Sequence, residues 1–184
     1  MPIPAFKLNK PNRKYTWADY QTWPDDERWE IIDGAAYRMS PSPTWEHQGA
    51  VGELAGLLHK FLQGKPCKPM VSPLDVKFDE LSVVQPDLTV WCGGSKDNRG
   101  KLTVAVEVLS STTSSYDLVR KRGLYEKHGV PEYWVVAPDE KRITRLSMLD
   151  GKYVDELFET GAFTSEVLEG FTFDVDAFFE QSEE

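Results

Sequence analysis

The sequence contains little cysteine, little histidine and no long apolar run. Its 184 residues include three histidines and two cysteines, Cys67 and Cys92. The cysteines lack the spacing of zinc ligands, so we expect free thiols in a reducing, cytoplasmic compartment. No apolar run approaches the length that spans a bilayer, and residues 1–14 lack the apolar core of a signal peptide. We therefore expect a soluble protein that does not enter a membrane, with residues 1–14 as a loose N-terminal arm.

The net charge of −9 argues against nucleic acid as a partner when it is taken for the whole chain. The charge is unevenly distributed, however. Residues 150–184 hold eleven acids and one base, Lys152, whereas the other 149 residues have a net charge of +1. The acidity therefore belongs to the C-terminal end, and the rest of the chain permits a nucleic-acid partner.

The composition is that of an ordinary globular protein, with 40% hydrophobic and 12% aromatic residues. A chain of this length suits one domain with a well-formed core. We find no repeat and no low-complexity segment. The sequence therefore predicts a single domain over residues 15–184.

Two short apolar runs each carry a carboxylate. Residues 88–92 and 102–109 have the pattern of buried strands, yet Asp87 stands at the start of the first and Glu107 lies within the second. An unpartnered charge is costly to bury. The two acids therefore require a cation between them, a shared proton or a basic side chain close by.

A basic side chain follows in the next predicted element. Residues 114–128 have the pattern of a helix, with Ser114 as N-cap and Asp117 as the acid of a capping box. At about 100° per residue, Lys121 falls within the apolar stripe that Leu124 and Tyr125 help to define. The pattern places the Lys121 ammonium where it could reach the two acids.

The remaining pattern is that of an α/β protein. A helix is predicted over residues 45–62, with His47 on its core-facing side, and a strand over residues 132–136. The unit strand 102–109, helix 114–128 and strand 132–136 favours a right-handed crossover with parallel pairing. Asp33-Gly34 and Asp150-Gly151 are signals for hairpin turns, and residues 175–179 for a terminal helix.

Several short motifs occur in an order that resembles a known family. They are WEIIDG at 29–34, QPD at 85–87, EVLS at 107–110, Lys121-x-x-x-Tyr125 and GVPEYWVV at 129–136. Together they are similar to the signature of the Uma-two family of predicted endonucleases, within the PD-(D/E)xK restriction-endonuclease-like superfamily. The resemblance covers residues 15 to about 146. It implies a central mixed β-sheet flanked by helices, here followed by a β-rich C-terminal extension.

The resemblance also implies a metal-dependent nuclease site. Asp87 and Glu107 would hold a divalent ion, Mg²⁺ or Mn²⁺, together with the main-chain carbonyl of Val108. The superfamily lysine stands two residues after the second acid, and that position is Leu109 in this sequence. Lys121 on the next helix matches the migrated lysine of the family.

Further expectations come from the same resemblance. Glu30 matches a glutamate that often completes the metal shell, and His47 would contact the phosphate or hold a neighbouring carboxylate. Gln85 would bond into the pocket, and Tyr125 would pack against the stem of Lys121. DNA is the expected substrate, and a homodimer would address its two strands.

Each of these residues also has a purely structural interpretation. Asp87 would be a turn residue, Lys121 would extend to water, and His47 would be a hydrogen-bonded core residue. Aromatic residues are expected in the core rather than on a base-stacking surface: Trp29, Trp45, Tyr133 and Trp134. Two other functions stay open, namely a catalytically inactive nuclease fold that binds nucleic acid or assembles with protein, and hydrolysis of a small phosphorylated substrate.

Overall fold

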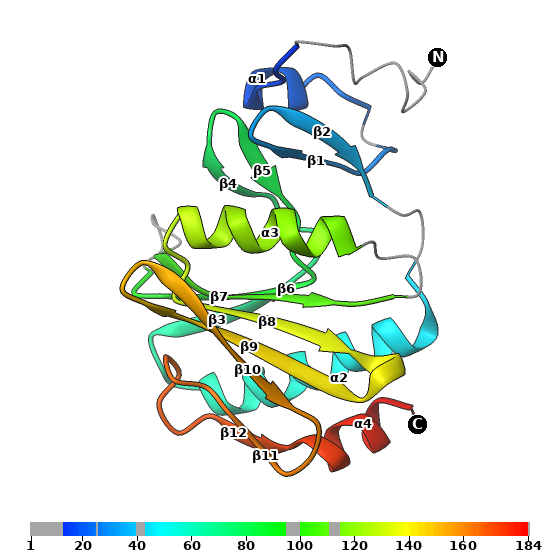
Figure 1. Cartoon of the computed structure of the whole chain (residues 1–184), viewed down its shortest axis with the longest axis vertical. Helices are drawn as coiled ribbons and strands as arrows, with labels where there is room; N and C mark the ends of the chain where they lie inside the picture. The colour runs from blue at the N-terminus through cyan, green and yellow to red at the C-terminus, as the bar shows by residue number, and fades with distance from the viewer. Residues whose placement is uncertain (1–12, 25, 40–42, 95–99, 111–114, 184) are drawn as a thin grey trace. The chain divides into compact units, whose positions relative to one another are not determined.

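A computed structural model describes residues 13–24, 26–39, 43–94, 100–110 and 115–183 (Figure 1). Most of the expected N-terminal arm and the expected N-cap Ser114 lie outside the described residues, as does the side chain of Asp117. The chain divides into two compact units. The first takes the described residues up to Met39 together with residues 73–85, and the second takes the rest. The single domain over residues 15–184 stays a prediction.

The first unit is a four-stranded antiparallel sheet with the order β2-β1-β5-β4 and one short helix. The hairpin at Asp33-Gly34 is confirmed, because both residues have positive φ (49° and 86°), as such a tight turn requires. A capping box between Thr16 and Asp19 starts the helix. The elements are α1 Trp17–Tyr20, β1 Trp29–Ile32, β2 Ala35–Arg38, β4 Val76–Asp79 and β5 Ser82–Val84.

The second unit contains a six-stranded sheet with the order β10-β9-β8-β7-β6-β3. Strands β7 and β8 pair in parallel and the other neighbours are antiparallel, so the predicted mixed sheet and the parallel crossover are confirmed. The strands are β3 Cys67–Val71, β6 Leu88–Cys92, β7 Lys101–Val108, β8 Glu132–Ala137, β9 Arg142–Leu149 and β10 Lys152–Phe158.

Helices cover both faces of this sheet (Figure 1). Helix α2, Trp45–Leu62, has Thr44 as its N-cap and buries Leu54 and Leu58 among residues of β6, β7 and β8. Helix α3, Ser115–Lys127, lies on the opposite face. No helix in the described part of the chain is long and apolar enough to cross a membrane.

The C-terminal extension is β-rich, as predicted. After the short 3₁₀ helix η2, Pro138–Glu140, strands β9 and β10 form a hairpin at Asp150-Gly151, again with positive φ at both turn residues. Strands β11 Ala162–Thr164 and β12 Thr172–Asp174 form a separate two-stranded sheet, followed by α4 Val175–Glu183. The sequence did not predict β11 and β12, because three residues are too few to show an alternating pattern.

The prediction of free thiols is wrong, because Cys67 and Cys92 form a disulfide. Strands β3 and β6 pair in a register that places the two cysteines directly opposite each other, with their Cα atoms 4.0 Å apart. The pairing depends on this register rather than on spacing along the chain. The argument for a reducing compartment that rested on free thiols therefore no longer applies.

Replacing both cysteines with alanine is expected to lower the free energy of unfolding by about 2–4 kcal/mol. The bond joins residues separated by 25 positions, and a crosslink of that span restricts the unfolded chain. Urea unfolding with and without dithiothreitol measures the effect, and the double variant should not respond to the reductant. A wild-type protein that unfolds identically in both conditions would contradict the prediction.

Candidate active site

Two neighbouring strands bring Asp87 and Glu107 together. Strands β6 and β7 are antiparallel, with Leu88 opposite Val106. Asp87 immediately precedes β6, and its carboxylate accepts a hydrogen bond from the N–H of Val108, the residue after Glu107, so the two acids lie close together. Val106 is buried in the core with α2. Because successive side chains of a strand point to opposite faces, Glu107 points to the α3 face.

Glu107 lies in a buried polar cluster with two residues of α3. Its Oε1 accepts a bond from the Lys121 ammonium at 2.9 Å and another from the Tyr125 hydroxyl at 2.8 Å. Glu107 and Lys121 are each 8% exposed, and Tyr125 is fully buried. Lys121 therefore does not extend to water, and the structure brings the predicted helical lysine to the second acid.

The Tyr125 hydroxyl was missed as a partner of Glu107. Residues at i and i+4 share one face of a helix, so the spacing of Lys121 and Tyr125 carried the signal. From the sequence we expect Tyr125 only to pack against the stem of Lys121, whereas its hydroxyl also donates to Glu107.

Asp87 is held by a main-chain group and by a histidine. Its Oδ2 accepts a hydrogen bond from the Val108 N–H at 2.8 Å and lies 3.2 Å from the His47 Nε2. Burial by itself would lower the pKa of His47, but the neighbouring polar groups, chiefly the hydrogen bond and charge of Asp87, together outweigh it, so the pKa is raised. Of the two roles expected for His47, holding a neighbouring carboxylate agrees with this contact. The Val108 carbonyl as a metal ligand stays a prediction.

Asp87 and Glu107 fit an open Mg²⁺ site better than a site in which protein side chains supply all the ligands. Among the residues that the structure describes, no group of three or more His, Cys, Asp or Glu side chains is arranged to hold a metal. Asp87 and Glu107 supply two carboxylates at adjacent positions. Mg²⁺ is commonly bound through one or two carboxylates and keeps several waters, so this pair suits it.

Glu30 and Gln85 form a network within the first unit. The Glu30 Oε1 accepts the Gln85 main-chain N–H at 2.8 Å, and Glu30 is 6% exposed. The Gln85 side chain accepts a bond from Arg28 and donates to Tyr20 and Asp75. The contributions of Glu30 and Gln85 to a metal site stay predictions.

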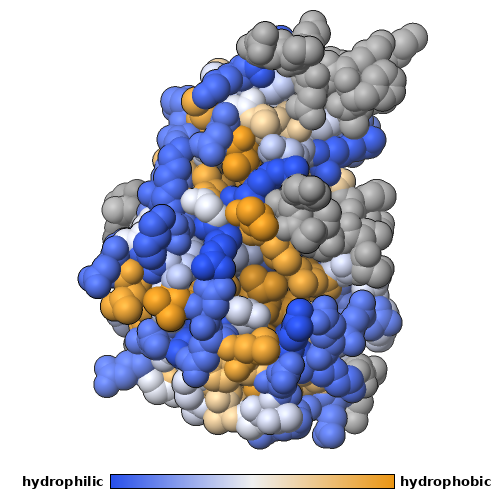
Figure 2. All heavy atoms as spheres, in the orientation of Figure 1, coloured by the Kyte–Doolittle hydropathy of each residue, from blue (hydrophilic) through white to orange (hydrophobic). Residues whose placement is uncertain are grey.

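Trp45 does not lie in the core. Trp29, Tyr133 and Trp134 are buried as expected, but Trp45 is 73% exposed, so that prediction is wrong. Trp45 precedes His47 by two residues, which is about 200° around a helix, and therefore faces solvent when His47 faces inward. Figure 2 shows apolar side chains at the surface on the face of the molecule drawn there.

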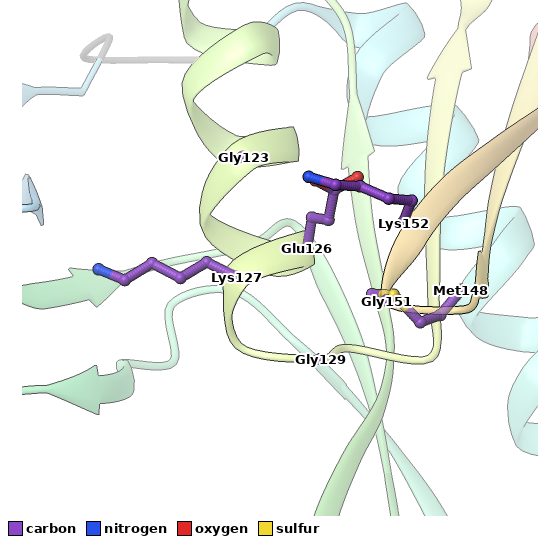
Figure 3. Close-up of a pocket in the computed structure, with 7 residues that line it drawn as sticks. All are labelled: Gly123, Glu126, Lys127, Gly129, Met148, Gly151 and Lys152. Carbon is purple, nitrogen blue, oxygen red and sulfur yellow. The ribbon is translucent and has the colours of Figure 1, made fainter.

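A hollow in the second unit lies apart from these residues (Figure 3). It is formed by the end of α3 and the β9–β10 turn, and Lys152 reaches across it to Glu126 while Lys127 points away. Hydrogen bonds from the Lys152 ammonium and the Tyr153 N–H hold the pKa of Glu126 below its usual value. None of the candidate site residues lines this hollow.

Comparison with known proteins adds independent support. A family model described as "Uma2: Putative restriction endonuclease" matches residues 17–176. The chain belongs to the Uma2 family. This membership supports a nuclease-like function. In this Uma2 chain, Leu109 occupies the usual lysine position, whereas Lys121 of α3 contacts the second acid.

A solved structure has the same fold. The chain resembles a protein of Anabaena variabilis described as "a putative nuclease belonging to DUF820", with a TM-score of 0.76 and 15% identity. The match covers 91% of this Uma2 chain and 98% of that protein. No curated protein matches the sequence. The predicted restriction-endonuclease-like fold is therefore confirmed.

Proposed function

We propose that the protein is a metal-dependent endonuclease that hydrolyses phosphodiester bonds in DNA. The observation that carries this proposal is the buried cluster in which Glu107 accepts a hydrogen bond from the Lys121 ammonium, while Asp87 accepts one from the N–H of Val108, the residue after Glu107. A buried acid and ammonium side by side are expensive to maintain for stability alone. They are common where a site must hold charge in a fixed place.

Asp87 and Glu107 would hold the Mg²⁺ or Mn²⁺, which supplies a polarised water and neutralises charge on the phosphate when bound. His47 and the Val108 N–H fix the orientation of Asp87 through its Oδ2. Lys121 is positioned by Glu107 to orient the attacking water or to stabilise negative charge that grows on the phosphate oxygens.

The alternative of an inactive nuclease fold gains its support from Leu109 and from the acidic C-terminal end. The contact between Lys121 and Glu107 favours the active enzyme, because it retains an ammonium at the second acid. The homodimer and the cytoplasmic location remain predictions from sequence.

The test is a cleavage assay with purified protein on plasmid, duplex and single-stranded DNA, with Mg²⁺, Mn²⁺ or EDTA. We expect cleavage with either ion and none with EDTA, and calorimetry should detect Mn²⁺ binding without DNA. DNA binding without cleavage would support the inactive alternative. A protein that binds neither ion and cleaves no DNA would overturn the proposal.

A further inference from the structure

The sheet face that carries Glu107 of β7 continues across β6 to an exposed strip on β3. Leu88 and Val90 of β6 are buried in the core with α2, so Thr89 and Trp91, which are linked by a hydrogen bond, belong to the opposite face. At about 3.3 Å per residue, Trp91 lies roughly 13 Å from Asp87 along the strand. The strip therefore lies on the same face of the sheet as Glu107 of the candidate active site.

Strand β3 adds a cation and an apolar side chain to the same face. The register places Lys68 opposite Trp91 and Met70 opposite Thr89. Lys68 is exposed, Met70 is 45% exposed and Trp91 is half-buried. Residues directly opposite on antiparallel strands have Cβ atoms about 5 Å apart, so Lys68 and Trp91 occupy neighbouring positions on this face.

The indole ring of Trp91 is fixed in orientation. Its Nε1–H donates to the Thr89 Oγ1 at 3.0 Å, and the Thr89 hydroxyl donates in turn to the Met70 carbonyl at 3.3 Å. Thr89 is only 1% exposed. A ring that is held before the ligand arrives loses little freedom on binding, which favours stacking.

We infer that this strip, Lys68, Met70 and Trp91, binds a single-stranded segment of the nucleic-acid substrate. A base stacks on the ring of Trp91 and Lys68 contacts a phosphate, which is the combination that proteins use for unpaired strands. The inference rests on the proposed function, and it adds that the enzyme acts on DNA with unpaired nucleotides beside the cut.

A protein strand is a poorer occupant of the same edge. Strand β3 is the last strand of the six-stranded sheet, and Pro69 stands in its middle. Proline has no N–H, so it interrupts the ladder that an added strand would need. The exposed side chains of β3 therefore fit a nucleic-acid strand better than a second β-strand.

The test is fluorescence anisotropy with a labelled single strand and the matching blunt duplex, in EDTA so that no cleavage occurs. We expect Trp91→Ala to weaken single-strand binding by about 10-fold or more, and Trp91→Phe to retain most of it. Lys68→Gln should lower the slope of log K against log salt by about 0.7. Lys60→Gln, on α2, removes the same charge from another exposed element and should bind as the wild type does.

The outcomes separate this inference from the proposed function. If the wild type cleaves DNA while the Trp91 and Lys68 variants bind the single strand normally, the inference is overturned and the nuclease stands. If the wild type binds the single strand through Trp91 but never cleaves, the strip is supported and the nuclease falls. If Trp91→Ala fails to fold, binding of the single strand by Trp91→Phe and Lys68→Gln tests the inference instead. Self-association that requires Trp91, seen by sedimentation, would assign the strip to a second copy and overturn the inference.

Discussion

Replacing Glu107 with glutamine is expected to slow DNA cleavage on the order of 1000-fold while the fold is retained. A carboxylate that holds the metal contributes several kcal/mol to stabilising charge in the transition state, and about 4 kcal/mol corresponds to that factor. Glutamine keeps the shape of the side chain and an oxygen for Lys121 and Tyr125. Cleavage rates at saturating Mg²⁺, with circular dichroism of each variant, provide the measurement.

The Lys121 ammonium complicates the interpretation of simpler variants. Glu107→Ala would leave a buried cation without this partner, and removing one side of a buried ion pair costs about 3–5 kcal/mol of stability. The double variant Glu107→Gln with Lys121→Met should recover stability yet stay inactive. Glu126→Gln, an acid of the same helix outside the site, should cleave at the wild-type rate. Normal cleavage by Glu107→Gln would rule out the proposed role of Glu107.

Replacing Glu132 with alanine is expected to lower the free energy of unfolding by about 3–5 kcal/mol. Glu132 is fully buried at the start of β8 and accepts three hydrogen bonds, from the Trp134 Nε1–H, the Ser165 hydroxyl and the Glu166 N–H. Alanine would leave these donors without their acceptor in or near the core, at about 1–3 kcal/mol each before relaxation. The segment after β11 would lose its attachment to β8.

Urea unfolding measures this loss, and the melting temperature should fall by roughly 10 °C for a chain of this size. The control is Glu140→Ala, which removes an ion pair with Arg142 in which the side chains of Glu140 and Arg142 are 52% and 41% exposed. Exposed ion pairs contribute about 0–1 kcal/mol, so the control should stay close to the wild type. A Glu132→Ala protein as stable as the control would show that the segment after β11 does not depend on this acid.

The stability of the protein is expected to depend on pH through Glu132. Burial raises the pKa of Glu132 above its usual 4.5, and the three hydrogen bonds and the Arg145 charge offset this only in part. A carboxyl group whose pKa is higher in the folded chain than in the unfolded chain adds to the free energy of unfolding in full below about pH 4.5. This stabilisation is lost as the pH rises through the pKa of the folded state. Glu132→Gln should lack this decline when unfolding is followed from about pH 4.5 to neutral.

Local chemistry made much of the fold predictable. Asp-Gly pairs adopt positive φ readily, so both hairpins, at Asp33 and at Asp150, could be located from two residues each. The unit β7–α3–β8 followed from its strand and helix patterns and from the handedness of crossovers. Lys121 could be placed on the core-facing side of its helix, because helical periodicity determines that it shares a face with Tyr125.

Other features depended on partners that no local pattern identifies. Trp45 was assigned to the core from its residue type, but the orientation of α2 is set by His47, Leu54 and Leu58, and this turns Trp45 to solvent. The acceptor role of Glu132 requires Ser165 and Glu166, which lie more than thirty positions farther along the chain. Neither strand pattern nor spacing indicates such a contact.

Local sequence patterns predicted most of the longer helices and strands, the two Asp-Gly hairpins, and the two acids and lysine that the family motifs carry. These follow from periodicity and from the preferences of single residues, which act over a few positions. Three features came to light only in the folded chain: the Cys67–Cys92 disulfide, the hydrogen bonds of both Tyr125 and Lys121 to Glu107, and the position of Lys68 opposite Trp91. Each of these depends on strand register or on the docking of a helix, and both are set by the packing of the whole core. A shift of one residue in register would move every side chain of a strand to the other face of the sheet.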